Sequence, residues 1–242
     1  MALEFTTASE ATEVGGVKCM VYGGSGVGKT MLMATAPVPI LISAESGMMS
    51  LRKTNLERVY GAGNPAIDYD VKAIKVSSVE DLTAAHAWCK ANAWSSGFRT
   101  VGLDSISEIM EVVLSNAKAQ VKDPRQAYGE LIDKGSMLVR AFRDLPGLNV
   151  VVAAKMEYSK DEVTGISRYA PSVPGNKLGQ AMPYFFDEVF HLGVNKDTAG
   201  NPYRYLRTQP DIQYEAKDRS GMLADVEYPH LGAVFSKVLG TK

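Results

Sequence analysis

The sequence predicts an α/β domain built on a mainly parallel β-sheet with helices on both faces. Apolar runs without polar alternation recur along the chain, as expected of strands that are covered on both sides. Amphipathic helical patterns separate these runs, and such alternation is typical of a parallel sheet. With 242 residues, of which 45% are hydrophobic, the chain can bury one full core. We therefore expect a single domain at residues 17–242, preceded by an N-terminal arm at residues 1–16.

Five short apolar runs are the expected strands of the parallel sheet. They are residues 17–22, 38–43, 100–103, 149–154 and 186–192. Between them, Ser78 followed by Asp81 forms a capping box that predicts a helix to about Ala93. A second helix begins near Ile106, because apolar residues from there to Ala117 fall on one helical face.

The pattern changes after residue 192. The stretch VNKDTAGNPYRYLRTQ predicts two strands joined by a turn at residues 197–201, and a further strand is expected near residues 212–216. The C-terminal part should therefore add antiparallel strands to the same sheet.

Composition and charge narrow the classes of function. The chain has 26 basic and 27 acidic side chains, so overall charge gives no sign of a nucleic-acid binder. No apolar run has the length of a membrane span, and the first residues lack the order of a signal peptide, so we expect a cytosolic protein without membrane contact. Cys19 and Cys89 lie far apart without metal-ligand spacing and are interpreted as packing residues.

A glycine-rich loop follows the first expected strand. The run GGSGVGKT fits the pattern G-x-x-x-x-G-K-[ST] and stands between a strand and a helical stretch, the context that a phosphate-binding loop requires. Backbone N–H groups would surround the β-phosphate, Lys29 would reach the β and γ oxygens, and Thr30 would ligate Mg²⁺. We therefore expect ATP and Mg²⁺ as cofactors. The expected nucleotide contacts are Gly23, Gly24, Ser25, Gly26, Val27, Gly28, Lys29, Thr30 and Met31.

Three further polar residues follow expected strands, at the sheet edge where α/β proteins bind ligands. Asp104 would hold Mg²⁺ through water, or cap the helix that follows it, or do both. Glu45 would orient and deprotonate the attacking water, unless it is an ordinary surface glutamate. Lys155 would sense the γ-phosphate, and a lysine that only extends to solvent at a strand end is the alternative.

The order of the motifs GGSGVGKT, AESG, VGLDS, VVVAAK and AKDRSG resembles the RecA-like core ATPases. The resemblance is greatest to the small phage ATPases of the Sak type, which assist single-strand annealing and homologous recombination. It implies a RecA-like P-loop NTPase core and a catalytic Glu45. It also implies that Lys217 and Arg219 reach the γ-phosphate of a neighbouring subunit, so that the protein works as a homo-oligomer, a ring or a filament. A charged β-turn is the alternative reading of AKDRSG.

The same resemblance implies two DNA-binding loops, at residues 122–130 and 156–177. Both combine cations for phosphates with aromatic rings for base stacking, as single-stranded DNA requires. The candidate contacts are Lys122, Arg125, Tyr128, Tyr158, Lys160, Arg168, Tyr169 and Lys177. The second region also carries acidic residues, and a plain hairpin that turns at Thr164 and Gly165 is the alternative there.

One departure and one short match remain. The sensor position is a glutamine in RecA itself, whereas Lys155 stands here, which leaves the route from nucleotide to DNA loop open. The run FTTA, with Phe5 and Ala8, is similar to the tether by which RecA-like recombinases of archaea and eukaryotes dock onto the next subunit. A disordered arm is the alternative.

These expectations combine into an ATPase that acts on single-stranded DNA in phage recombination or annealing, with a single-strand-binding protein as a further expected partner and the host cytoplasm as its location. A helicase-like motor or loader in DNA replication would use the same core. A small-molecule kinase would need an acceptor pocket and an arginine-rich lid, but the arginines are dispersed. A P-loop protein without turnover is the fourth alternative, and Glu45 argues against it.

Overall fold

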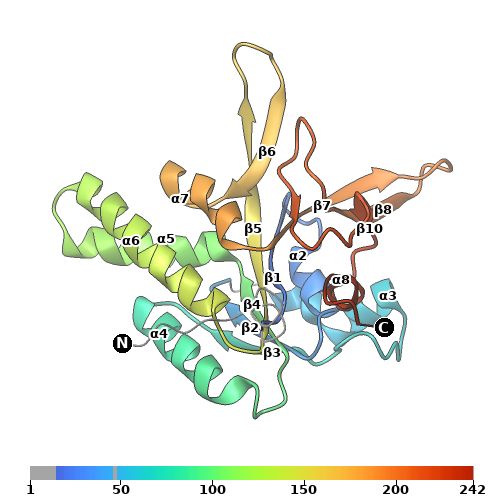
Figure 1. Ribbon diagram of the computed structural model, residues 1–242. Helices are drawn as coiled ribbons and strands as arrows, with labels where there is room; N and C mark the ends of the chain where they lie inside the picture. Colours follow the sequence, from blue (N-terminus) through green and yellow to red (C-terminus); the bar gives the residue numbers. More distant parts are fainter. Residues whose placement is uncertain (1–14, 46–47, 242) are drawn as a thin grey trace, which may run out of the picture.

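The computed structural model describes residues 15–45 and 48–241, and its strands form one twisted sheet (Figure 1). The strands, in chain order, are β1 (Lys18–Gly23), β2 (Pro39–Ser43), β3 (Lys72–Lys75), β4 (Thr100–Asp104), β5 (Asn149–Lys160), β6 (Ser167–Ser172), β7 (Glu188–Lys196), β8 (Pro202–Arg207), β9 (Lys217–Asp218) and β10 (Val226–Glu227). The helices are α2 (Lys29–Met33), α3 (Lys53–Tyr60), α4 (Val79–Trp88), α5 (Ile106–Gln120), α6 (Pro124–Arg143), α7 (Asn176–Ala181) and α8 (Leu231–Val238). Short turns of 3₁₀-helix, η1 (Met48–Leu51) and η3 (Met182–Phe185), and one π-helical turn, η2 (Cys89–Ala93), join them.

The sheet is parallel in its centre and antiparallel at its C-terminal side. Its strand order is β10-β8-β7-β1-β5-β4-β2-β3, and neighbours from β7 to β3 run parallel. Strands β8, β9 and β10 join antiparallel beyond β7, and β6 pairs antiparallel with β5. The fold class expected from the sequence is therefore confirmed.

Helices cover both faces of the sheet and enclose two cores. Along β5, Val150 and Val152 face the core under α4, α5, α6 and α7, while Val151 and Ala153 face the core under α2 and α8 (Figure 1). This period of two explains why the strand reads as an unbroken apolar run. Burying each such valine contributes about 1.5–3 kcal/mol, so the central strands anchor the edge on which the polar motifs lie.

Local capping rules explain two of the helix starts. The Ser78 side chain accepts from Asp81 N at 3.0 Å, which confirms the capping box, and η2 extends this helix to Ala93 as expected. At α5 the cap is Ser105, whose Oγ accepts from Glu108 N at 3.4 Å. The cap role that was open for Asp104 therefore belongs to its neighbour.

Strand β5 continues past the sheet edge and pairs with β6 in a hairpin that projects from the molecule (Figure 1). Its turn uses Gly165, whose φ of 70° lies in the left-handed region, and Asp161, which accepts from Thr164 N at 2.8 Å. The alternative of a hairpin in residues 156–177 is therefore confirmed for Met156 to Ser172.

Two expected elements are wrong. Of the loop expected at residues 122–130, everything from Pro124 onward is helix α6, because Asp123 caps the helix with its side chain and proline suits the first helical position. The strand expected near residues 212–216 is only a single bridge between Tyr214 and Tyr169. Asp211 accepts from the backbone N–H groups of Gln213 and Tyr214, each at 2.7 Å, and this turn replaces strand pairing.

Other expectations are met in the described residues. Cys19 and Cys89 are free and buried in the cores. Strands β7 and β8 form the expected hairpin, with Asp197 accepting from Asn201 N at 2.8 Å in its turn. No helix in residues 15–45 or 48–241 is long and apolar enough to cross a membrane.

Candidate nucleotide site

A cavity of about 990 Å³ opens at the carboxyl edge of the parallel strands. Strand register explains why the motifs meet there, since Gly23 on β1 pairs with Lys155 on β5, and Ser43 on β2 pairs with Asp104 on β4. The expected residues that line the cavity are Gly23, Gly24, Ser25, Gly26, Gly28, Lys29, Thr30, Met31, Glu45, Asp104 and Lys155. Val27 also belongs to the loop, but its side chain is buried in the core under α2.

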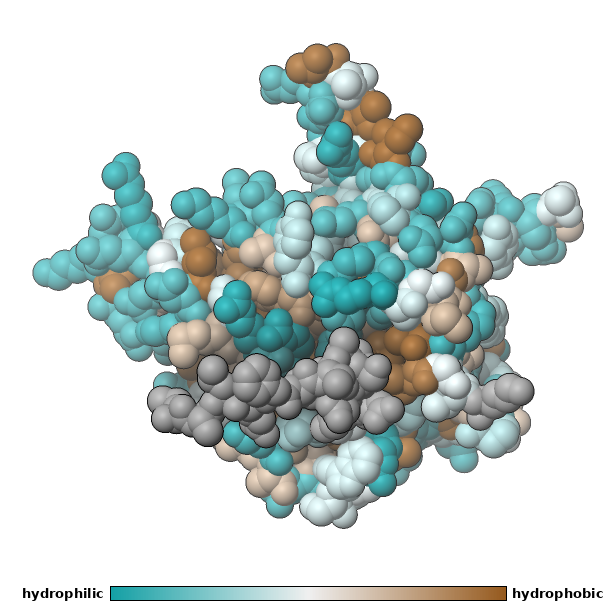
Figure 2. Space-filling view, viewed as in Figure 1, coloured by the Kyte–Doolittle hydropathy of each residue, from teal (hydrophilic) through white to brown (hydrophobic). Residues whose placement is uncertain are grey.

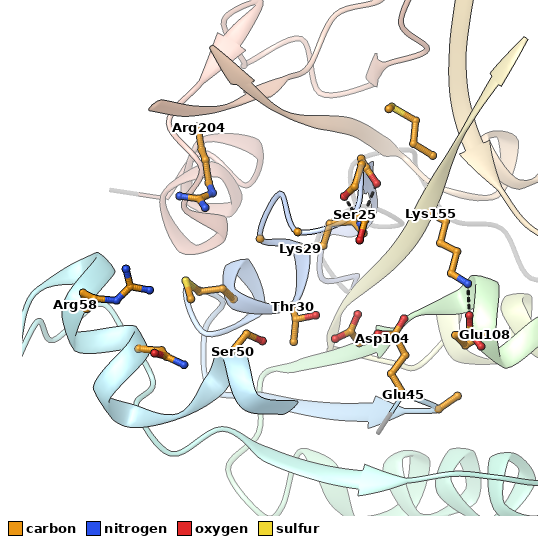
Figure 3. Close-up of a pocket in the computed structure, with 18 residues that line it drawn as sticks. Ser25, Lys29, Thr30, Glu45, Ser50, Arg58, Asp104, Glu108, Lys155 and Arg204 are labelled. Carbon is orange, nitrogen blue, oxygen red and sulfur yellow. Dashed lines mark hydrogen bonds and ion pairs between the residues drawn. The ribbon is translucent and has the colours of Figure 1, made fainter. Parts of the chain in front are cut away.

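The glycine-rich loop has the backbone that phosphate binding needs. Gly26 and Gly28 have φ angles of 72° and 109°, which residues with a side chain rarely adopt. Lys29 Nζ donates to Gly23 O at 2.8 Å and Gly24 O at 2.9 Å, so the ammonium lies over the loop (Figure 3). Burial lowers the pKa of Lys29, and the charges of Asp104 and Glu45 oppose this effect.

Asp104 and Thr30 form the part of the cavity that suits a metal ion. Asp104 is 4% exposed, and burial raises its pKa while a hydrogen bond from Thr30 lowers it. A buried carboxylate next to a hydroxyl matches Mg²⁺, which takes one or two protein oxygens together with phosphates and waters. The residues present therefore fit the expected metal. Groups of three His, Cys, Asp or Glu side chains that could hold an ion alone are absent from residues 15–45 and 48–241.

Glu45 lies beside this pair, just beyond β2. Its Oε1 accepts from Ser105 Oγ at 2.8 Å, and its backbone N–H donates to Ser43 Oγ at 3.2 Å. These two serines, at the ends of neighbouring strands, orient the carboxylate toward Asp104 and Thr30 (Figure 3). A carboxylate so held can position a water against the terminal phosphate of a nucleotide.

Lys155 forms an ion pair with Glu108 on α5. The hydrogen bond to Glu108 raises the pKa of Lys155, so its ammonium stays charged. The side chain is still 55% exposed and points along the cavity wall at the base of the projecting hairpin (Figure 3). Glu108 was not expected in the site; it lies in the first turn of α5, the helix that begins directly after Asp104 and Ser105.

Lys217 and Arg219 lie outside the cavity of their own chain. Lys217 Nζ donates to Pro183 O at 2.8 Å, and Arg219 Nη1 pairs with Asp187 Oδ1 at 2.6 Å. Both are on or next to β9, which pairs with the amino-terminal half of β7, away from the loop edge. In cis they therefore do not contact a nucleotide in this cavity.

The expected DNA-binding residues form two groups. Tyr158, Lys160, Arg168 and Tyr169 are all on the projecting hairpin. Lys122, Arg125 and Tyr128 lie at the start of α6, where Lys118 Nζ lies 5.6 Å from the Tyr128 ring, and Lys177 lies on α7. The positions of Phe5 and Ala8 lie outside the described residues.

Five polar lining residues were not predicted: Ser50, Asn55, Arg58, Glu108 and Arg204. Arg204 Nε donates to Val27 O at 2.6 Å across 177 positions of the chain, so no local sequence signal could place it there. Arg58, by contrast, lies on α3, which follows β2 and Glu45 closely along the chain. This closeness in sequence could have suggested it as a lining residue.

Comparison with known proteins identifies the family. The model of an AAA domain matches residues 15–220, and the chain therefore belongs to this family of AAA domains, which implies nucleotide binding, typically with Mg²⁺. No curated protein matches the chain in sequence. A KaiC-like protein from the archaeon Pyrococcus horikoshii has a TM-score of 0.42 and 13% identity over 79% of this chain and 77% of its own. The RadB recombinase has a TM-score of 0.45 and 15% identity over 81% of this chain and 89% of its own. Both TM-scores are low, so neither structure bears on function.

Proposed function

We propose that this AAA domain protein hydrolyses ATP while acting on single-stranded DNA, in phage recombination or strand annealing, with ATP sites between subunits. The observation that carries the proposal is the meeting of Lys29, Thr30, Asp104 and Glu45 in one cavity. Together these residues would meet three requirements of phosphoryl transfer to water: a cation on the phosphates, a metal site and a base.

The residues of the cavity divide the work of hydrolysis. The loop's N–H groups and Lys29 bind the β and γ oxygens, while Thr30 and Asp104 would hold Mg²⁺, which neutralises charge on the phosphates. Glu45, oriented by Ser105, accepts a proton from the attacking water. Because Asp104 is buried and hydrogen-bonded to Thr30, this carboxylate is better suited to the metal and Glu45 to the proton.

Lys155 supports a connection between the nucleotide and DNA. A γ-phosphate near Gly23 would compete with Glu108 for the Lys155 ammonium. Lys155 is also the first residue of β5 beyond the buried part of the strand, at the base of the hairpin. If Lys155 changed its partner from Glu108 to a phosphate, the hairpin would therefore be the first element to shift.

The hairpin has the features of a single-strand binder. Tyr158 is 58% exposed and shares a face of the hairpin with the exposed Lys160. Arg168, also exposed, pairs with Ser159 and lies on the other face. Figure 2 shows polar side chains along one edge of the hairpin and apolar ones at its tip and along the other edge. Cations for phosphates and rings for bases are the combination that such binding uses.

ATPase measurements test this function. We expect turnover of the purified chain to rise when single-stranded DNA is added, and this stimulation to fall steeply with salt, because phosphate contacts release counterions. Turnover that ignores DNA and depends on a small acceptor would contradict the proposal and favour a kinase. A Lys29→Ala variant is the control for contaminating ATPases.

A further inference from the structure

Two arginines line the end of the nucleotide cavity that is farthest from Glu45 and Lys155. Arg58 extends from α3 and Arg204 from β8, and their guanidinium groups lie on the same side of the glycine-rich loop (Figure 3). The acidic lining residues Glu45, Asp104 and Glu108 gather at the opposite end (Figure 3). One end of the cavity therefore carries the carboxylates that suit metal and water chemistry, and both charged side chains at the other end are arginines.

Arg204 packs directly against the loop backbone. Its Nε donates to Val27 O at 2.6 Å, and a Cβ added to Gly28 would come within 3.2 Å of Nε and 3.9 Å of Cζ. The guanidinium therefore lies next to Gly28, the N-cap residue of α2. A glycine at this position leaves space for the arginine as well as permitting the φ angle of 109°.

The rest of the Arg204 guanidinium is free to bind a ligand. In residues 15–45 and 48–241, neither Arg204 nor Arg58 forms an ion pair, and Arg204 makes no hydrogen bond beyond that of Nε. The other arginine of β8 differs, because Arg207 pairs with Asp211 at 3.0 Å. A guanidinium with one nitrogen fixed on the protein and two nitrogens left over is well arranged for phosphate oxygens.

The direction of a bound nucleotide follows from the other end of the cavity. Thr30, Asp104 and Glu45 mark the γ-phosphate, and the loop from Gly23 to Gly28 surrounds the β-phosphate. The remaining phosphate must then lie toward Gly28 and Met31, where the cavity continues to Arg204 and Arg58. From this geometry we propose that Arg204 binds the α-phosphate of the nucleotide held by its own subunit, with Arg58 facing it across the nucleoside end. The inference rests on the proposed nucleotide site and adds to it a residue that acts in cis.

Nucleotide affinity tests this role. For Arg204→Ala we expect the Kd of ADP and that of a slowly hydrolysed ATP analogue to rise by the same factor, roughly tenfold or more, because a hydrogen-bonded charge pair is lost. The Kd of GDP should rise by the same factor as that of ADP, since the α-phosphate is common to both nucleotides. The Kd values of Arg204→Lys should lie between those of wild type and Arg204→Ala, because lysine keeps the positive charge but lacks the two parallel N–H donors of a guanidinium.

Two matched variants make the comparison specific. Lys196→Ala removes a cation from the other strand of the same hairpin, opposite Pro202, and should leave every Kd unchanged. Lys155→Ala should weaken the triphosphate analogue alone, because it lies at the γ end. Nucleotide-free thermal midpoints of all variants report any purely structural role of the Arg204 bond to Val27 O.

Several results would overturn the inference. One is a lowered thermal midpoint of Arg204→Ala with unchanged Kd values. The others are a loss of affinity for the triphosphate alone and a loss of affinity for adenine nucleotides alone. At an ATP concentration well below the Kd of Arg204→Ala, a mixture of Arg204→Ala and Lys29→Ala subunits that turns over faster than the sum of the two variants alone would also overturn it, because two cis defects cannot complement each other. A wild-type chain that binds no nucleotide would instead contradict the proposed function itself.

Discussion

At the scale of single residues, two carboxylates at neighbouring strand ends differ in what surrounds them. Asp104 is almost fully buried next to Thr30, whereas Glu45 stands just past β2 with one oxygen fixed by Ser105 and the other without a recorded partner in the described residues. A metal ligand needs the first arrangement and a general base the second. This difference in surroundings supports the two roles proposed for these carboxylates, which the sequence could suggest only by their order along the chain.

Replacing Glu45 by glutamine tests its role as base. Glutamine keeps the size and can still accept from Ser105, so we expect unchanged Kd for ATP and a kcat lowered by about 10²-fold or more, the usual contribution of a general base. Steady-state turnover and equilibrium binding measure the two quantities. Glu80→Gln, on the exposed start of α4, is the matched control. A kcat within twofold of wild type would rule out this role.

Glu188 gives a second residue-scale prediction, on pH and stability. Burial raises its pKa to about 8, and the charge of Asp218 acts in the same direction. The folded chain therefore keeps a proton that the unfolded chain releases at much lower pH. The free energy of unfolding should consequently fall as pH rises, by about 2 kcal/mol between about pH 6 and pH 8.

Glu188→Gln should remove this dependence, because the amide resembles the protonated acid and does not titrate. Denaturant unfolding of both proteins near the two pH values measures the difference. Parallel curves for wild type and variant would show that Glu188 is ionised in the folded chain. An Asp187→Asn variant controls for the exposed carboxylate next to it in sequence.

Sequence motifs predicted the residues of the cavity that are encoded locally. Lys29 and Thr30 belong to one contiguous loop, and Asp104 and Glu45 each follow a buried strand, so the sheet brings them together automatically. Arg204 could not be predicted, because its contact with Val27 depends on how a hairpin folds back over the loop. Long-range contacts of this kind leave no spacing in the sequence.

At the scale of elements, a series of aromatic rings joins the projecting hairpin to the central strand. Tyr158 and Tyr169 have centroids 5.5 Å apart, Tyr169 stacks on Tyr214 at 4.8 Å, and Tyr214 stacks on His191 at 4.2 Å. His191 in turn lies 5.3 Å from Tyr22, whose hydroxyl donates to Tyr169 O at 3.1 Å. Since Tyr22 directly precedes the glycine-rich loop, the hairpin is packed rigidly onto the strand that carries the phosphate site.

The salt dependence of DNA binding is the prediction for this element. If Lys160 and Arg168 contact phosphates, the double alanine variant should flatten the slope of log K against log salt by about 1.4, because each contact to a single strand contributes about 0.7. Tyr158→Ala should weaken binding without changing the slope, since stacking releases no counterions.

The matched control shortens the other hairpin at its Asp197–Asn201 turn, which is exposed and carries none of the expected DNA contacts. Fluorescence anisotropy with a labelled oligonucleotide at several salt concentrations measures all four proteins. A slope that stays the same in the Lys160 and Arg168 variant, or that changes equally in the control, would exclude the hairpin as the DNA-binding element.

Strands and helices could be predicted where the apolar periodicity is strong. The predictions were wrong where side chains that cap helices or form turns determine the local structure. Strands β1, β2, β4 and β5 were found because they are buried on both faces. The start of α6 was taken for a loop because the resemblance implies a DNA-binding loop at residues 122–130, whereas Asp123 and Pro124 begin a helix there. The strand expected near residues 212–216 failed because one aspartate side chain outcompetes the ladder for backbone N–H groups.

At the scale of the whole molecule, the cavity and the β9 cations cannot act on each other within one chain. Lys217 and Arg219 are bound to Pro183 and Asp187, whereas the glycine-rich loop lies at the opposite end of β7. Burial lowers the pKa of Lys217, and the charge of Arg219 acts in the same direction. A further anion nearby would therefore stabilise the charged form of Lys217. A neighbouring subunit's γ-phosphate is the anion that the proposed assembly supplies.

Mixing of variants tests this arrangement. Arg219→Ala and Lys29→Ala subunits should each lose turnover by about 10³-fold, the smaller end of what a cation supplied in trans contributes. Mixed in equal amounts, they should regain about a quarter of the wild-type rate, because in a head-to-tail assembly that fraction of interfaces joins an intact loop to an intact Arg219. A mixture of Glu45→Gln with Lys29→Ala is the negative control, because both changes damage the same half of the site. Wild-type turnover per subunit should also rise with protein concentration, as measured across a dilution series. A rate independent of concentration, together with no recovery in the first mixture, would mean that Lys217 and Arg219 serve only to hold β9 on the sheet.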